Sequence, residues 1–258
     1  MLAPPQARAI LLGASNLALA LDAAIEAARE ILGGPIEILA AIGLGRSYGR
    51  PSRVLGRELP GILECGIWDA LASRPSLPRY HLLADIGNDI GYGVEPETLV
   101  RWVAECLERL EQPGARTAIV LPPVASLEGC PRWRFAAART ILFPSCRLGK
   151  EETLRRLAEV AAALRDLGAA AGAAVVDPPR EWYGLDPIHI RRAAREEAWR
   201  RSLESWGGGL GRGGQAPFRA ERFLGLSLRA ERYRVFGRER RRTQPVATFP
   251  DGTEISLY

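Results

Sequence analysis

The chain has 258 residues, of which 47% are hydrophobic and 25% are charged, and its formal net charge is +5. These values fit an ordinary globular protein with one large domain, or one domain with an appendage, and they argue against a fibrous or disordered chain. No window approaches the roughly 18 to 20 unbroken apolar residues of a membrane span, and the N-terminus lacks the pattern of a secretory signal. We therefore expect a cytoplasmic protein that is not inserted in a membrane.

Alternating strand and helix patterns run through the first 206 residues. This alternation is typical of a parallel sheet that is covered by helices on both faces. The predicted strands are 9–12, 36–42, 80–86, 117–121 and 173–176, and the predicted helices are 17–31, 97–110, 151–170 and 187–206. The predicted fold is thus a doubly wound α/β domain with five parallel strands.

A glycine-rich run at 207–214 (GGGLGRGG) is the clearest linker signal in the chain. Beyond it, residues 226–236 and 246–258 have strand character, and the second run contains a Pro-Asp-Gly turn. We therefore predict two parts: an α/β domain over residues 1–206, and a linker with a small antiparallel β appendage over residues 207–258.

Positive charge is concentrated in residues 219–242. This Arg-rich segment holds nine arginines against three glutamates, a net charge of +6, so the remainder of the chain is near −1. A solvated, charged surface is the ordinary explanation, and an acidic partner is the functional one. We do not expect nucleic acid to be that partner.

Four short polar or glycine-containing blocks follow four of the predicted strands. They are Gly13-Ala14-Ser15-Asn16, Gly43-Leu44-Gly45-Arg46, Gly87-Asn88-Asp89 and Asp186-Pro187-Ile188-His189. Ligands of open parallel sheets bind at the carboxyl ends of the strands, so these blocks are the first candidates for a site.

Taken in this order, the four blocks resemble those of the SGNH (GDSL-like) hydrolase superfamily, over about residues 8–206. The resemblance implies a flavodoxin-like three-layer α/β/α sandwich. It also implies that Ser15 is the nucleophile, that Asp186 and His189 complete a catalytic triad, and that Ser15, Gly45 and Asn88 form an oxyanion hole. No single block is specific, but four blocks in the right order after the right strands are.

The chemistry of these residues supports the same roles. A serine hydroxyl needs a base to take its proton, and the chain has only two histidines. His81 lies at the beginning of a predicted strand, at the wrong end of the sheet. His189 follows Asp186 by three residues, a spacing that presents a carboxylate to one imidazole nitrogen while the other faces the serine.

Each residue also has a purely structural explanation. Ser15 is a good helix N-cap, Gly45 is a common residue of a strand-to-helix turn, and Asn88 suits an Asx turn. The function follows from their combination: two-step hydrolysis of an ester through an acyl-enzyme, with donors aimed at the tetrahedral oxyanion. The resemblance favours small acyl groups, such as acetyl groups on carbohydrates.

The first block departs from the pattern of the family. The usual first block of the family is Gly-Asp-Ser, and here Ala14 stands in place of the aspartate, which removes a local hydrogen-bonding partner. The alternative hypothesis is therefore a catalytically silent fold of this type that binds a ligand or a partner. Arg46, Tyr48 and Tyr92 follow the oxyanion blocks and are candidates to contact the substrate, with a role as surface or packing residues as the alternative.

No metal or cofactor is predicted. The cysteines at 65, 106, 130 and 146 lie far apart and form no C-x-x-C pair, so neither a zinc site nor a disulfide framework is indicated. The aromatic loop 126–150, with Trp133, Phe135 and Phe143, is the predicted wall of a substrate pocket.

Overall fold

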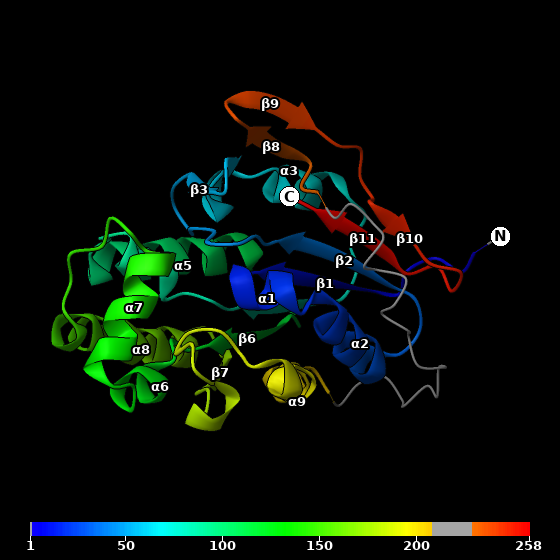
Figure 1. Cartoon of the computed structure of the whole chain (residues 1–258). Coiled ribbons are helices and arrows are strands. Elements are labelled where there is room, and N and C mark those ends of the chain that lie inside the picture. The colour runs from blue at the N-terminus through cyan, green and yellow to red at the C-terminus, as the bar shows by residue number, and fades with distance from the viewer. Residues whose placement is uncertain (1, 208–228) are drawn as a thin grey trace.

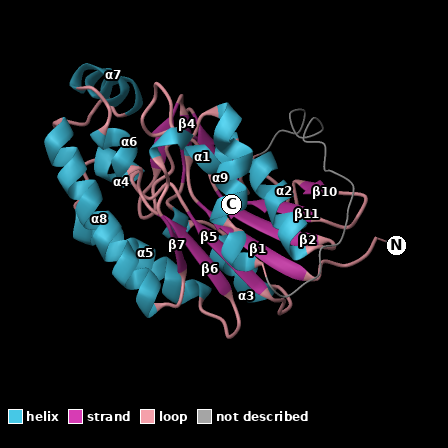
Figure 2. Ribbon diagram, turned by 90° about the horizontal axis from the view of Figure 1, so that it is seen from below, coloured by secondary structure: helices cyan, strands magenta, loops and turns pink. Residues whose placement is uncertain are grey.

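A computed structural model describes residues 2–207 and 229–258. Its central sheet has seven strands in the order β10-β11-β2-β1-β5-β6-β7 (Figure 1). Helices lie on both sides of this sheet (Figure 2). The strands of the central sheet are β1 (Ala7–Leu12), β2 (Ile36–Ala41), β5 (Arg79–Leu83), β6 (Arg116–Val120), β7 (Ala174–Val176), β10 (Ala247–Thr248) and β11 (Glu254–Leu257).

The five predicted strands are β1, β2, β5, β6 and β7, and all of them pair in parallel. Their order in space, with β1 between β2 and β5, is the flavodoxin-like order, so the predicted fold class is confirmed. β1 and β2 are buried along their whole length. Burial on both faces explains why their sequences are continuous apolar runs and not alternating ones.

Two hydrophobic cores lie on the two faces of the sheet. One contains apolar residues of α2 and α9, which pack against each other, and the other contains those of α3, α5 and α8. The helices are α1 (Ser15–Leu19), α2 (Leu21–Leu32), α3 (Ile67–Ser73), α4 (Asn88–Gly91), α5 (Pro96–Leu110), α6 (Val124–Glu128), α7 (Arg132–Leu142), α8 (Lys150–Ala170) and α9 (Arg195–Ser202), and the 3₁₀ turns are Ile62–Glu64, Arg180–Trp182, Arg192–Ala194 and Glu204–Trp206. None of the helices in the described residues has the length and apolar character needed to cross a membrane.

Two helix predictions need correction. The helix predicted at 17–31 is broken at Ala20, where φ is −142°, so a short α1 precedes α2. The helix predicted at 187–206 begins only at Arg195, after a 3₁₀ turn. The residues before it form a loop that closes through a bridge between Tyr183 and Ile190. Asp186 and His189 therefore lie on a loop. The spacing of apolar residues in the sequence did not show that the helix begins only after this loop.

The C-terminal residues contribute strands to both sheets. β11 pairs in parallel with β2 and antiparallel with β10, which confirms the predicted hairpin but places it at the edge of the central sheet (Figure 1). β8 (Arg232–Val235) and β9 (Arg238–Arg241) continue a second sheet, of order β3-β4-β8-β9, that starts with β3 (Ser52–Val54) and β4 (Arg57–Leu59). Most of the predicted linker at 207–214 and the first part of the Arg-rich segment lie outside the described residues.

Candidate active site

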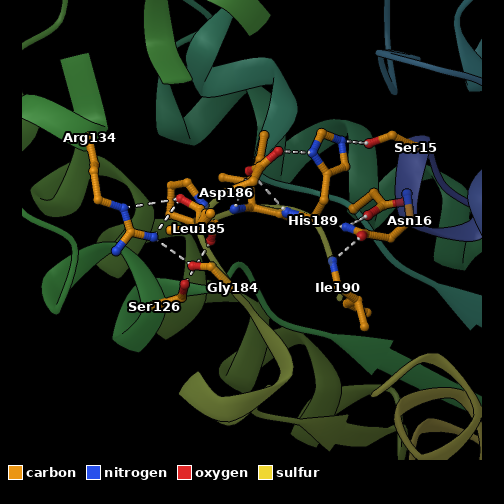
Figure 3. A network of polar contacts seen from close by, with 12 residues as sticks. Ser15, Asn16, Ser126, Arg134, Gly184, Leu185, Asp186, His189 and Ile190 are labelled. Atoms are coloured by element: carbon orange, nitrogen blue, oxygen red, sulfur yellow. Dashed lines mark hydrogen bonds and ion pairs between the residues drawn. The ribbon is translucent and has the colours of Figure 1, made fainter. Parts of the chain in front are cut away.

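The predicted nucleophile and base lie together at the carboxyl ends of the strands. Ser15 begins α1 directly after β1, and His189 lies on the loop before α9. The Nε2 atom of His189 is 2.9 Å from the Oγ atom of Ser15, and its Nδ1 atom is 2.5 Å from Oδ2 of Asp186 (Figure 3). This linear arrangement can pass the serine proton to the imidazole while the carboxylate fixes the tautomer and orientation of the ring.

The electrostatics of the pair suit a general base. Burial by itself would lower the pKa of His189, but the hydrogen bond and the charge of Asp186 raise that pKa above its ordinary value. Burial favours a higher pKa for Asp186, yet the hydrogen bonds from His189 and from the N–H of Ile188 hold the pKa of this carboxyl below its usual range. Asp186 is thus ionised at neutral pH and can stabilise the imidazolium that forms when Ser15 loses its proton.

The loop that carries Asp186 and His189 is held from two sides. Arg134 of α7 donates to the carbonyl oxygen of Gly184 at 2.7 Å and also bonds that of Leu185 (Figure 3). Ser126 of α6 donates to the carbonyl oxygen of Pro187 at 2.8 Å. Both residues lie in the predicted pocket wall at 126–150, but neither belongs to a recognisable motif, so the sequence analysis did not predict that they anchor this loop.

Three donors are available for an oxyanion. The Nδ2 atom of Asn88 is buried and has no hydrogen-bond partner in the described chain. No described residue accepts a hydrogen bond from the N–H of Ser15 or of Gly45. Gly45 has φ +61°, and a Cβ there would come within 2.5 Å of the Tyr92 hydroxyl, so only glycine fits this position. An unpaired buried amide is costly unless a ligand completes its bonding.

The structure does not support two of the predicted substrate contacts. Arg46 is 0% exposed and donates to the carbonyl oxygens of Ile42, Pro60 and Tyr258. Tyr48 is 1% exposed. Its hydroxyl donates to the carbonyl oxygen of Ala84 at 2.9 Å. Both side chains are buried and stabilise the fold, so the prediction that they contact the substrate is not supported.

Tyr92 and His81 have structural partners as well. The Tyr92 hydroxyl donates to the carbonyl oxygen of Gly45 at 2.7 Å, and the ring packs edge-on against Phe143. Tyr92 therefore supports the Gly45 turn. His81 is 1% exposed. Its Nδ1 atom lies 3.0 Å from the Thr117 hydroxyl, and burial lowers the pKa of this histidine to about 4. His81 is thus a neutral core residue and not a catalytic base.

An apolar cavity adjoins the site. It encloses about 880 Å³ including its mouth, and its wall contains Asn88 and the two neighbours of His189, Ile188 and Ile190. The predicted pocket wall at 126–150 supplies Leu127, Ala138, Leu142 and, of the three predicted aromatic residues, Phe135 and Phe143. Trp133 is 72% exposed and does not line the cavity. A largely apolar, concave site with a few polar groups is the usual form of a small-molecule site.

One residue of the site was missed by the sequence analysis. Asp85 follows β5, and its carboxylate accepts hydrogen bonds from the residues around Ser15. Asp85 was counted as part of the predicted strand 80–86. A charged side chain at the carboxyl end of a buried strand could have indicated a site residue. Within the described residues, no group of three or more His, Cys, Asp or Glu side chains could hold a metal ion.

Comparisons with known proteins support the fold but give little at the level of sequence. No family model matches the chain, and no curated protein is significantly similar to it. The native aryl esterase of M. smegmatis superimposes with a TM-score of 0.50 at 17% identity, covering 77% of this chain and 99% of that one. A carbohydrate acetylesterase family member from Sinorhizobium meliloti gives 0.49 at 19% identity, covering 76% of this chain and 95% of that one. The chain thus shares the fold of this aryl esterase, a mainly parallel sheet flanked by helices.

Proposed function

We propose that this protein is a serine ester hydrolase that acts through an acyl-enzyme. The observation that carries the proposal is the unbroken series of contacts from Ser15 through His189 to Asp186. Serine, imidazole and carboxylate in hydrogen-bond reach are the arrangement that turns a weak hydroxyl into a nucleophile. The free amide of Asn88 next to an apolar cavity adds the donor that acyl transfer requires.

In the proposed mechanism, the Ser15 oxygen attacks the ester carbonyl while its proton passes to Nε2 of His189. The tetrahedral oxyanion is stabilised by the N–H groups of Ser15 and Gly45 and by the Asn88 amide. Its collapse breaks the bond to the alcohol, which leaves with the proton from His189 and yields the acyl-enzyme. Water then attacks the acyl carbon and gives a proton to Nε2 of His189. Collapse of this second tetrahedral intermediate returns that proton to the Ser15 oxygen and releases the acid.

The proposed substrates are small-molecule esters, with the small acyl groups that the sequence resemblance favours as the first to test. O-acetylated carbohydrates belong to this class. The wall of the cavity is mostly apolar, with Asp85 and Arg139 as its charged residues, so we place the hydrocarbon portion of the acyl group against the apolar part.

The first experiment is intact-mass analysis after treatment with a fluorophosphonate, which reports an activated serine without the natural substrate. One adduct on the parent and none on Ser15→Ala is the expected result. The matched control is Ser73→Ala, because Ser73 is a surface serine whose hydroxyl bonds only to the carbonyl of Ala70. A folded parent that takes no adduct would overturn the proposal and favour the silent, ligand-binding alternative.

A second candidate role, binding of an acidic polymer, is supported by one observation. Within the described part of the Arg-rich segment, β9 and the residues after it expose Arg238, Arg240 and Arg242, for which the structure shows no ion pair. A salt-sensitive association with heparin that is lost in Arg238→Ser/Arg240→Ser would support this role. Equal retention of parent and variant on the polymer at low salt would contradict it.

A further inference from the structure

The Asp85 carboxylate is the centre of a hydrogen-bond network that reaches both the nucleophile and the base. Its Oδ2 atom accepts the backbone N–H groups of Ala14 at 2.8 Å, Asn16 at 3.1 Å and Leu17 at 3.2 Å. The N–H of Ser15, which lies between them in the chain, is the one that this carboxylate does not take. The turn is therefore clamped around Ser15 while the Ser15 donor is left for another acceptor.

The same carboxylate controls Asn16. Its Oδ1 atom accepts from Nδ2 of Asn16 at 2.7 Å, which fixes the orientation of the Asn16 amide. That amide donates to the carbonyl oxygen of Ile188 at 2.9 Å and accepts the N–H of Ile190 at 2.7 Å. Asn16 and Ile190 are seen beside His189 in Figure 3. Both chain neighbours of His189 are thus held by a side chain that Asp85 orients.

The backbone of Asp85 is itself unusual. Its φ is +59°, in the left-handed region of the backbone. Few residues other than glycine adopt this region, and asparagine and aspartate are the commonest of them. Such conformations persist where the surrounding contacts require them, and they cluster at functional sites. Here the left-handed turn accompanies a carboxylate that accepts four hydrogen bonds from residues 14–17.

We propose that Asp85 is the positioning residue of the active site, and that it supplies from the end of β5 the carboxylate that Ala14 does not supply in the first block. This inference rests on the proposed ester hydrolysis. Asp85 sets the position of Ser15 through three backbone bonds and that of His189 through Asn16, so it acts through these residues and takes no part in proton transfer. Its negative charge also favours the protonated form of His189.

The test uses Asp85→Asn, which keeps the size of the side chain and tolerates the left-handed backbone. Its amide nitrogen would face N–H donors in place of an acceptor. We expect kcat for a p-nitrophenyl ester to fall about a hundredfold, the scale that small misplacements of reacting groups produce, while KM changes by less than about threefold. We also expect the acidic limb of the pH profile of kcat/KM to move to lower pH, because the charge that raises the pKa of His189 is gone.

The matched control is Asp251→Asn. Asp251 also accepts hydrogen bonds from a backbone N–H, that of Thr253, and pairs with Arg29, but it lies in the turn between β10 and β11. Its variant is expected to keep the parent's kcat and pH profile. A further variant, Asn16→Ala, cuts the link to the His189 loop and leaves the Asp85 charge in place. It is expected to lower kcat at least tenfold without moving the acidic limb.

The outcomes separate this inference from the proposed function. A parent that reacts with the fluorophosphonate, together with an Asp85→Asn variant of parental kcat and pH profile, overturns the inference alone. A loss that Asp251→Asn reproduces also overturns it. If Asp85→Asn does not fold, the decision passes to Asn16→Ala, whose parental turnover would refute the positioning role. A folded parent that is not labelled at Ser15 removes the ground for the proposed function and for this inference together.

Discussion

The Oγ atom of Ser15 and the Nε2 atom of His189 are 2.9 Å apart although 174 positions separate them in the chain. The sheet brings them together. β1 lies in the middle of the sheet and ends at Leu12, and the loop before α9 lies at the same carboxyl ends of the strands. The Asn16 amide donates to the carbonyl oxygen of Ile188 and accepts the N–H of Ile190, and these two bonds hold the two segments together. The geometry of the pair thus depends on residues that do not react.

The pH dependence of hydrolysis is the first prediction. The base must be neutral to take the serine proton, and Asp186 raises the pKa of His189 above its ordinary value near 6.5. The value of kcat/KM should therefore fall as the pH drops through that raised pKa, and it should be constant above it. In Asp186→Asn, kcat should fall by about a thousandfold to ten-thousandfold, and the acidic limb of the residual activity should lie at lower pH.

The measurement is the rate of p-nitrophenyl ester hydrolysis from pH 5 to 9 at constant ionic strength. Asp177→Asn is the control, because Asp177 forms an exposed ion pair with Arg165 and is not bonded to Ser15 or His189. An acidic limb that stays in place in Asp186→Asn would show that the carboxylate does not determine the pKa of His189.

The role of Asn88 gives the second prediction. Truncation in Asn88→Ala removes the unpaired Nδ2 donor and leaves the backbone carbonyl that accepts from Tyr92. Loss of one oxyanion donor typically lowers kcat by a hundredfold to a thousandfold with little effect on KM. The control is Gln112→Ala, which removes a side-chain amide that donates to the carbonyl oxygen of Leu77 before β5, and both constants should be unchanged in it. An equal loss in the two variants would contradict a specific role.

The site was predictable to the extent that its residues follow strands. Ser15, Gly45 and Asn88 come directly after β1, β2 and β5, and the carboxyl ends of parallel strands meet at one edge. His189 was identified because the chain has one other histidine. In each case, local sequence and a general property of the fold were sufficient.

The remaining features depend on contacts between distant segments. The burial of Arg46 requires the carbonyl groups of Pro60 and Tyr258, which no local pattern places beside it. The network of Asp85 requires β5 to lie next to β1. A glycine-rich run suggested a domain boundary, yet β11 returns to pair with β2, because a flexible connection separates elements in sequence without separating them in space.

The size of the cavity gives the third prediction. Ala138 of α7 lines it, so Ala138→Phe should fill part of the space and lower kcat/KM for p-nitrophenyl octanoate at least tenfold relative to the acetate. Ala137→Phe is matched to it, because Ala137 lies on the same helix, is exposed, and is absent from the cavity wall. The ratio of the two esters should be unchanged in that control. An unchanged ratio in Ala138→Phe would place the acyl group outside the cavity.

The last prediction concerns the C-terminal strand, and it tests whether the chain divides near Trp206. Ile255 of β11 is 0% exposed and pairs with Ile38 of β2 inside the core. Ile255→Ala should lower the free energy of unfolding by about 2 to 5 kcal/mol, the range for deletion of a buried aliphatic side chain. A chain that ends at Trp206 would lose β11 entirely and expose the apolar edge of β2, so we expect it to aggregate and to show no hydrolysis.

Urea unfolding monitored by circular dichroism measures the effect, and Ile141→Ala is the control, because Ile141 is 76% exposed and the same atoms are deleted. The control should change the free energy of unfolding by no more than about 0.5 kcal/mol. Equal urea midpoints for Ile255→Ala and the parent would mean that the Ile255 side chain adds nothing to the stability of the core. A folded and active chain ending at Trp206 would mean that the division suggested by the glycine-rich run is correct. A midpoint that falls only in Ile255→Ala would make the C-terminal strand an integral part of the domain that carries Ser15.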